Sequence, residues 1–256
     1  MNSAPRILCI GGHDPTGGAG IQADIETVHA LGGLPSTLLT ALTVQDTGDV
    51  AAVAPVDAAF LARAGATLID DIRPDLIKIG LIGAAEQIPV LLALVRRSQA
   101  PVVLDPVLTA GGGFDLSGQG LIDAIAQALL PAVKLVTPNL DEARRLTGAD
   151  NPEDAARALL ETGAGAVLLT TTDGTQGDQV VNRLYRAGAA TLDYPWPRLA
   201  GHYHGSGCTL ASACATLLGL GRTLEDAVRE AQAFTWRALA TAGAPGRGQQ
   251  IPRRLA

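Results

Sequence analysis

Residues 6–31 read RILCIGGHDPTGGAGIQADIETVHAL, and this stretch contains the order of elements that decides the fold. Residues 6–10 form a short apolar run typical of a buried strand. Apolar side chains then recur at helical spacing from Ile21 to Leu31. Between the two lies a glycine-rich loop, which could bring backbone amides close to a ligand at a helix N-terminus or could simply form a tight turn. The loop lacks the lysine of a Walker P-loop, and its composition leaves both interpretations open.

The alternation of apolar runs and helical segments continues along the chain. We expect further strands at residues 37–44, 76–79, 102–104, 134–137, 166–170 and 179–185. We expect further helices at residues 58–72, 88–95, 121–130, 153–161, 209–220 and 224–240. Buried strands separated by helices predict an α/β fold, with a parallel sheet covered on both faces, in one domain over residues 1–256. Ligands of such sheets bind beyond the carboxyl ends of the strands.

Composition excludes several classes of protein. The chain has 256 residues, of which 47% are hydrophobic and 17% are charged, so it can bury a core and disorder is not expected. Its net charge of −6 argues against nucleic acid or an anionic membrane as partner. No apolar run reaches about 18 residues, which favours a cytoplasmic protein. Three cysteines without a C-x-x-C pair exclude a disulfide framework and a zinc knuckle.

A second glycine turn, residues 205–208 with the sequence GSGC, opens a long apolar helix. Amides at such a turn form an anion hole, and the helix N-terminus should lower the pKa of the Cys208 thiol. Cys208 could therefore be a base or nucleophile, or it could pack the turn. The other two cysteines lie in apolar stretches and are expected in the core. Cys208 with His202 and His204 could make a zinc site, but no orienting ligand is evident.

Several acidic and amide side chains follow predicted strands or open predicted helices. Asp105 ends a strand and should point into the crevice, unless it only closes a turn. Asn139 and Glu142 could organise the water shell of Mg²⁺, or could form a helix capping box, and the spacing favours neither. Asp24 could hold a polar group of a ligand, or could be a carboxylate stabilised in the first turn of its helix.

Together these pieces resemble the hydroxymethylpyrimidine/phosphomethylpyrimidine kinase family of thiamine biosynthesis, in the ribokinase-like superfamily. The resemblance is carried, in family order, by residues 12–24, 40–47, 78–81, 103–107, 129–131, 137–142 and 204–210. It implies a three-layer α/β/α sandwich with a mostly parallel central sheet. It also implies transfer of phosphate from ATP, with Mg²⁺, to 4-amino-5-hydroxymethyl-2-methylpyrimidine and then to its monophosphate. The superfamily often forms dimers, so a homodimer is expected.

The resemblance further implies roles for individual residues. Cys208 would be the base, beside an anion hole formed by Gly205, Ser206 and Gly207. The pyrimidine would be held by Gly12, Asp24, Gln45, Leu81 and Val107. The ATP phosphates would lie near Asp105, Asn139, Glu142, Thr170 and Thr172. Asp105 and Glu142 would hold Mg²⁺, largely through water.

One segment departs from the family pattern. Many members carry Lys-Gly-Gly-His or Thr-Gly-Gly-His near the nucleotide phosphates, and this chain has TTTDG at residues 170–174. Two alternatives therefore stay open: a pyridoxal- or pyridoxine-type vitamin kinase, which shares fold and motif order, and a catalytically weak pyrimidine-binding relative. An NAD-binding oxidoreductase fits poorly, because the glycine spacing differs and no acidic residue ends a second strand.

Overall fold

Nine strands form one sheet in the computed structural model, which describes residues 4–109, 118–170 and 177–255. The strand order is β3-β2-β1-β4-β5-β6-β7-β8-β9. The six strands from β2 to β7 in this order are parallel, whereas β3 at one edge and β8 and β9 at the other are antiparallel. The strands are β1 Arg6–His13, β2 Leu34–Gln45, β3 Val50–Pro55, β4 Leu76–Ile79, β5 Val102–Leu104, β6 Leu135–Val136, β7 Val167–Leu169, β8 Gln179–Tyr185 and β9 Leu192–Pro197.

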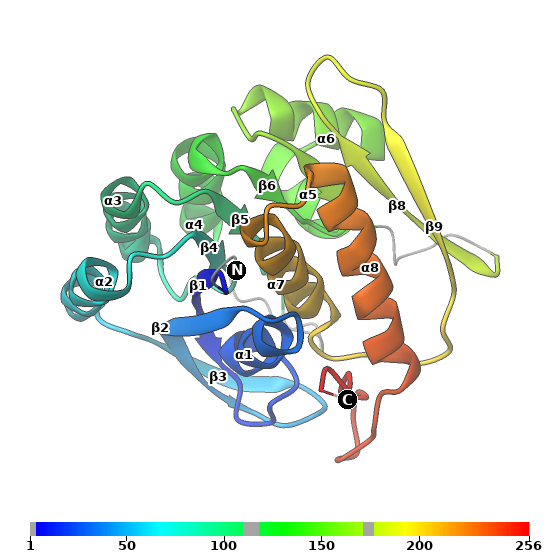
Figure 1. Cartoon of the computed structure of the whole chain (residues 1–256), viewed down its shortest axis with the longest axis horizontal. Coiled ribbons are helices and arrows are strands. Elements are labelled where there is room, and N and C mark those ends of the chain that lie inside the picture. The colour runs from blue at the N-terminus through cyan, green and yellow to red at the C-terminus, as the bar shows by residue number, and fades with distance from the viewer. Residues whose placement is uncertain (1–3, 110–117, 171–176, 256) are drawn as a thin grey trace.

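Helices cover both faces of this sheet (Figure 1). They are α1 Gly20–Ala30, α2 Ala58–Ile72, α3 Ile88–Ser98, α4 Gln119–Ala124, α5 Leu140–Thr147, α6 Pro152–Glu161, α7 Ser206–Gly219 and α8 Leu224–Ala240. Three short turns of helix complete the list: η1 Ala85–Gln87, η2 Ile125–Leu129 and η3 Leu130–Ala132. Among the described residues, none of these helices is long and apolar enough to cross a membrane.

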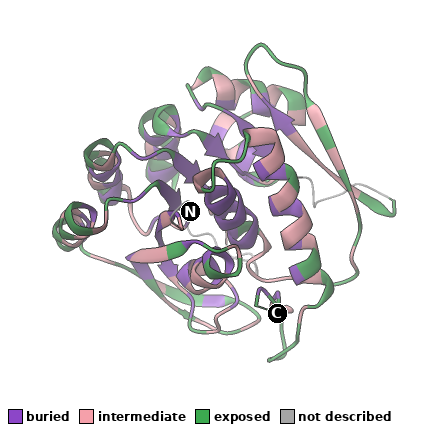
Figure 2. Ribbon diagram, in the orientation of Figure 1, coloured by how far each residue is buried: buried purple, intermediate pink, exposed green. Residues whose placement is uncertain are grey.

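The core consists of two apolar layers, one on each face of the sheet. Along β1, Leu8 and Ile10 pack under α2 to α6, whereas Ile7 and Cys9 pack under α1, α7 and α8. This alternation follows from the two-residue period of a strand. Figure 2 shows that burial is most complete in the central strands and α7. The predicted α/β/α sandwich with a mostly parallel sheet is confirmed.

Most predicted elements are present, and two strands were missed. Alanine-rich β3 is an edge strand with much of its length exposed, and β9 contains two prolines, which strands tolerate only near an edge. Neither has the apolar pattern of the central strands. The helix predicted at residues 121–130 is divided among α4, η2 and η3. Cys9 and Cys214 lie in the core as predicted, and the three cysteines are free thiols.

Candidate active site

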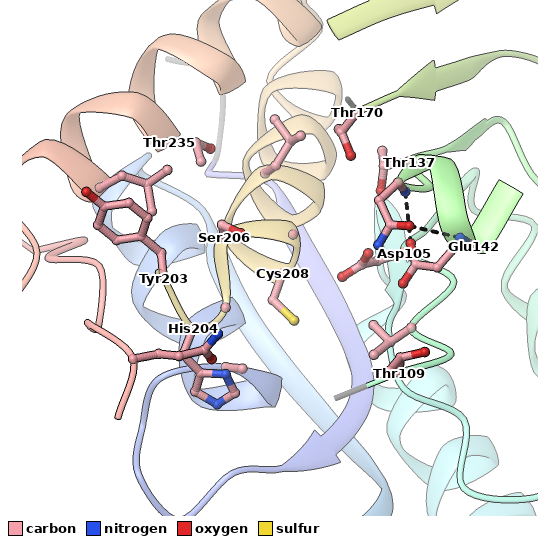
Figure 3. Close-up of a pocket in the computed structure, with 18 of the residues that line it drawn as sticks. Asp105, Thr109, Thr137, Glu142, Thr170, Tyr203, His204, Ser206, Cys208 and Thr235 are labelled. Atoms are coloured by element: carbon pink, nitrogen blue, oxygen red, sulfur yellow. Dashed lines mark hydrogen bonds between the residues drawn. The ribbon is translucent and has the colours of Figure 1, made fainter. Parts of the chain in front are cut away.

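A cavity of about 960 Å³ opens at the carboxyl ends of the parallel strands. Its floor is formed where β1, β4, β5, β6 and β7 end, as expected for a sheet of this type. The N-terminus of α7 forms one wall, and the start of α5 forms the wall opposite (Figure 3). Predicted site residues on this surface are Gly12, Gln45, Leu81, Asp105, Val107, Asn139, Glu142, Thr170, Gly205, Ser206, Gly207 and Cys208.

The glycine loop before α1 is held by backbone contacts and by one carboxylate. Gly20 has a φ of +60°, and a side chain there would overlap the carbonyl oxygen of Gly12, so only glycine fits. Asp14 accepts hydrogen bonds from the amides of Thr16 (2.8 Å) and Ala19 (2.7 Å). The loop is therefore both tightly packed and part of the cavity wall, which combines the two interpretations left open by its sequence.

Asp14 also links the loop to two other segments of the cavity wall. Its Oδ2 lies 2.8 Å from Nε2 of His204, and its carboxylate is hydrogen-bonded by Gln45. Burial opposes ionisation, but the hydrogen bonds from His204, Thr16 and Gln45 outweigh it and hold the pKa of Asp14 well below its usual range. Asp14 was not predicted as a site residue, and His204 was considered only as a zinc ligand, although both lie within motifs that the sequence marks.

The N-terminus of α7 lies directly behind this loop. Gly205 has a φ of +80°, and a side chain there would overlap the carbonyl oxygen of Gly18. The amides in the first turn of a helix have no partner within the helix, so Ser206, Gly207 and Cys208 present donors to the cavity that they line. This geometry fits the anion hole that the sequence predicts.

The prediction of a lowered pKa for Cys208 is wrong for the protein without ligands. Burial raises the pKa of this thiol to about 12; Lys78 and the Gly20 amide lower it, while Asp105 and Asp24 raise it. The N-termini of α1 and α7 therefore meet at the sulfur. Burial of the thiol and the charges of the two carboxylates nevertheless raise its pKa by more than the helix N-termini and Lys78 lower it. A thiolate here requires a further positive charge, or removal of negative charge, when substrates bind.

Asp105 and Glu142 lie on the wall opposite the start of α7 (Figure 3), and the Cys208 thiol is hydrogen-bonded to the carboxylate of Asp105. Both carboxylates are buried, and Oδ2 of Asp105 has no hydrogen-bond partner among the described residues. Burial raises the pKa of Asp105. Burial and then the charge of Asp105 raise the pKa of Glu142 to about 8. Two crowded carboxylates, one with an orphaned oxygen, are a fitting place for a divalent cation.

Glu142 also forms the capping box that was the alternative to a magnesium role. The amide of Asn139 donates to Oε2 of Glu142 (2.9 Å), and the amide of Glu142 donates to Oδ1 of Asn139 (2.8 Å). Since both side chains line the cavity as well, the cap fixes their orientation there. The structural and the functional interpretation of this motif are therefore compatible.

The raised pKa of Glu142 predicts how stability depends on pH in magnesium-free buffer. Between the ordinary value of 4.5 and about 8, the folded protein holds a proton that the unfolded chain has released. The contribution of Glu142 to the free energy of unfolding should therefore fall as pH rises through this window. Glu142→Gln should remove that decline, measured by urea unfolding from pH 5 to pH 9. Exposed Glu161→Gln is the control, and parallel curves for Glu142→Gln and wild type would contradict the assignment.

Asp24 is placed differently from the prediction. It is fully buried beneath the cavity floor, where Lys78 donates to its two carboxylate oxygens (2.8 and 3.1 Å) and Ser212 donates to Oδ1 (2.7 Å). The predicted contact between Asp24 and substrate is therefore not supported, because its acceptors are used inside the protein. Lys78, which lines the cavity from a buried strand, was not predicted as a site residue. Its partner, Asp24, is 54 positions away in the sequence.

Lys78 is the positive charge at the centre of the floor. Burial opposes its charged form, but Asp24, then Cys208 and Asp105, raise the pKa of Lys78 above its ordinary value. The lysine therefore stays protonated, and its charge acts on Asp105 and on the Cys208 sulfur. A lysine in an otherwise apolar strand was the available signal in the sequence.

The far end of the cavity is formed by β8, β9 and α8. Trp196 and Arg198 line it from β9 and the segment after β9, and Gln232 and Trp236 line it from α8. Thr172, which the resemblance places near the ATP phosphates, lies outside the described residues. His202 and His204 line the cavity, but no three metal-ligating side chains are grouped in the described parts of the chain.

Comparisons with known proteins agree with this geometry. The model of the phosphomethylpyrimidine kinase family matches residues 14–253. The chain is 40% identical over 249 residues to a thiamine biosynthesis bifunctional protein ThiED of Geobacter sulfurreducens, covering 94% of this chain and 50% of that protein. It is 36% identical over 242 residues to a hydroxymethylpyrimidine/phosphomethylpyrimidine kinase of Rhizobium meliloti, covering 92% and 90%. The chain thus spans about half of the first relative and most of the second.

Solved structures show the same fold. A pyridoxal kinase of Staphylococcus aureus in complex with pyridoxal superposes with a TM-score of 0.90 at 28% identity, covering 99% of this chain and 94% of that one. The same enzyme has been solved with AMP-PCP and pyridoxal together. A phosphomethylpyrimidine kinase of Clostridium difficile superposes with a TM-score of 0.77 at 29% identity, covering 92% and 99%.

Proposed function

Because the chain belongs to the phosphomethylpyrimidine kinase family, we propose that it phosphorylates 4-amino-5-hydroxymethyl-2-methylpyrimidine with ATP, and then the resulting monophosphate, in thiamine biosynthesis. The observation that carries this proposal is one cavity lined by β1, β2 and the residues after β4, by α5, α8 and the β8–β9 hairpin, and by Cys208 with the glycine turn before α7. Phosphoryl transfer needs two substrates held in line in one such cavity.

The pyrimidine belongs at the end formed by β1, β2 and β4. Gly12 and Leu81 contribute a narrow apolar surface there, since a side chain on Gly12 would lie only 2.7 Å from Cδ2 of Leu81. Gln45 supplies an amide, and Val107 closes the same end. A flat ring with one amino group and ring nitrogens matches a slot with few polar contacts. Asp24 acts here only through Lys78.

The nucleotide belongs at the end formed by α5, α8 and the β8–β9 hairpin. Thr170 and Asn139 reach its phosphate side, and Trp196 and Trp236 reach its outer side. Positive charge at this end comes from Arg144 and Arg198, both in the cavity wall. These arginines supply charge where many relatives have a lysine or histidine in the segment that corresponds to residues 170–174.

The negative charge of the transferred phosphoryl group is stabilised by two groups on opposite walls of the cavity. The α7 amides of Ser206 and Gly207 stabilise the anionic oxygens. Asp105 and Glu142 would hold Mg²⁺ opposite them, and the orphaned oxygen of Asp105 fits that role. Mg²⁺ supplies neutralisation of the phosphate charge. Cys208, after its thiol has lost its proton, accepts the proton of the hydroxymethyl group as the hydroxymethyl oxygen attacks the γ-phosphorus and ADP leaves.

A pyridoxal kinase is the second candidate, and one observation favours it. The pyridoxal kinase of S. aureus superposes more closely, with a TM-score of 0.90, than the C. difficile phosphomethylpyrimidine kinase does, with 0.77. Both acceptors are substituted heteroaromatic rings with a hydroxymethyl group, so the same slot and the same base could serve either one.

Product analysis by mass spectrometry separates the candidates. The purified protein is incubated with Mg-ATP and, separately, with the hydroxymethylpyrimidine, its monophosphate and pyridoxal. We expect the pyrimidine mono- and diphosphates as the dominant products. Pyridoxal phosphate as the dominant product would replace the proposal by the second candidate. No product from any acceptor, with binding of the pyrimidine retained, would identify a catalytically weak relative.

We also propose that the chain forms one kinase domain and a homodimer. All described strands belong to one sheet, which supports a single domain. Along β2, Thr43 and Gln45 line the cavity, whereas Leu42 and Val44 are 49% and 66% exposed. Apolar side chains exposed near a sheet edge favour association with a second copy. Light scattering on the purified protein should give twice the monomer mass. The mass measured for Val44→Glu should be lower, closer to that of a monomer.

A further inference from the structure

The segment that follows α8 returns to the substrate end of the cavity. The amide of Gln249 donates to the carbonyl of Thr47 (2.7 Å), and the carbonyl of Gln250 accepts from the amide of His204 (2.9 Å). Figure 1 shows this segment in red, ending close to α1. It carries Arg254 to the glycine loop, although 236 positions separate Arg254 from Gly18 in the sequence.

The guanidinium of Arg254 is fully buried between the two glycine turns. Its Nε donates to the hydroxyl of Thr209 on α7 (2.8 Å), and Nη2 donates to the carbonyl of Gly18. Its Nη1 lies 3.4 Å from the carbonyl of Gly17 and 3.1 Å from Oε2 of Glu26 on α1. One side chain therefore connects the loop before α1 with the first turn of α7.

These two turns determine where the Cys208 sulfur lies. The Thr209 hydroxyl that accepts from Arg254 donates in turn to the carbonyl of Gly205 (2.7 Å), at the start of α7. From the other side, the Gly20 amide at the start of α1 donates to the sulfur of Cys208. The cavity wall includes Cys208 and Gly20 but not Arg254, which lies behind it.

We propose that Arg254 is a positioning residue, whose guanidinium sets the spacing between the glycine loop and the N-terminus of α7 and so places Cys208 against the acceptor. Its effect on turnover rests on the proposed kinase reaction; its effect on the two turns does not. A planar group with donors in fixed directions can bridge three acceptors, whereas a lysine places one ammonium at a single point. Displacement of a reacting group by about 1 Å can cost about 100-fold in rate.

Kinetics provide the first test. Arg254→Ala should lower kcat about 10- to 100-fold while KM for ATP and for the acceptor stays within about threefold. Arg254→Lys keeps the charge but not the bridge, so its kcat should stay close to that of Arg254→Ala. The neighbouring Arg253→Ala is the matched control, because Arg253 is exposed, and it should retain wild-type kcat.

Hydrogen exchange provides a second test that needs no substrate. In Arg254→Ala the hydrogen-bonded amides of residues 17–20 and of Thr209 should exchange at least about tenfold faster, while those of β4 and β5 keep their wild-type rates. Glu26 is partly exposed and stays solvated without its partner, so Arg254→Ala leaves no buried carboxylate unpaired.

Each outcome decides the proposal. Faster exchange confined to the two turns, with the loss in kcat, supports it. Uniformly faster exchange, unchanged exchange, or full activity of Arg254→Lys would overturn it. If wild type phosphorylates no acceptor, the proposed function fails, and local exchange alone still decides whether Arg254 holds the turns together.

Discussion

Replacement of Cys208 by alanine is expected to leave the fold intact and to lower kcat about 10²- to 10⁴-fold, the range that a general base contributes. The sulfur lies at the meeting point of the α1 and α7 N-termini and lines the cavity between the two substrate ends. Alanine keeps the first turn of α7 and removes only the proton acceptor. KM for ATP should change little, because the anion hole is formed by backbone amides.

The pH profile distinguishes a base from a packing residue at this position. Burial raises the pKa of Cys208 to about 12 in the free protein, so the thiolate is scarce at neutral pH. Neutralisation of Asp105 by a bound cation would remove one of the charges that oppose the thiolate. We therefore expect log kcat of the wild type to rise with pH between about 6 and 9, and the residual activity of Cys208→Ala to lack this slope.

Cys214→Ala is the matched control, because Cys214 lies on the same helix and packs in the core. It should retain wild-type kcat and lose stability by the cost of a small buried cavity. Turnover by Cys208→Ala within threefold of wild type would remove the base from the proposed mechanism and leave positioning and charge stabilisation to account for the rate.

The central elements were predictable from apolar periodicity alone. Helix Ala58–Ile72 and strand Val102–Leu104 have the predicted bounds, because an amphipathic helix and a strand buried on both faces have distinct patterns. Edge strands have neither pattern: β3 is largely alanine and exposed, and β9 alternates with prolines. Their presence depends on pairing with a neighbour rather than on their own composition.

Site residues were predictable where they lie in glycine turns or at strand ends. They were less predictable where their role depends on a side chain far away in the sequence. Gly12, Leu81 and Asp105 line the cavity because Gly12 lies near the end of β1, and Leu81 and Asp105 come shortly after β4 and β5. Their contacts with substrates stay predictions. The environment of a charge depends on the whole fold, so neither the burial that raises the pKa of Cys208 nor the pairing of Asp24 with Lys78 could be seen in the local sequence.

Lys78→Met is expected to cost about 3–5 kcal/mol of stability near pH 8, the cost of breaking a buried ion pair by removal of one partner. Methionine has a similar volume, so the effect comes from charge rather than from a cavity. Asp24 would remain fully buried with Ser212 as its described partner, and the neighbouring carboxylate of Asp105 would lose the cation that favours its ionised form.

The two other variants of a thermodynamic cycle, Asp24→Asn alone and Asp24→Asn with Lys78→Met, isolate the pair. Asp24→Asn with Lys78→Met removes both charges and should recover much of the loss, because the uncompensated carboxylate is gone. The exposed Lys134→Met controls for loss of a lysine and should change the free energy of unfolding by less than about 0.5 kcal/mol. The free energy of unfolding is measured in urea for the wild type and for these four variants. A loss below about 1 kcal/mol in Lys78→Met, or no recovery in the double variant, would mean that water or another group compensates Asp24 and that the floor of the cavity does not depend on this pair.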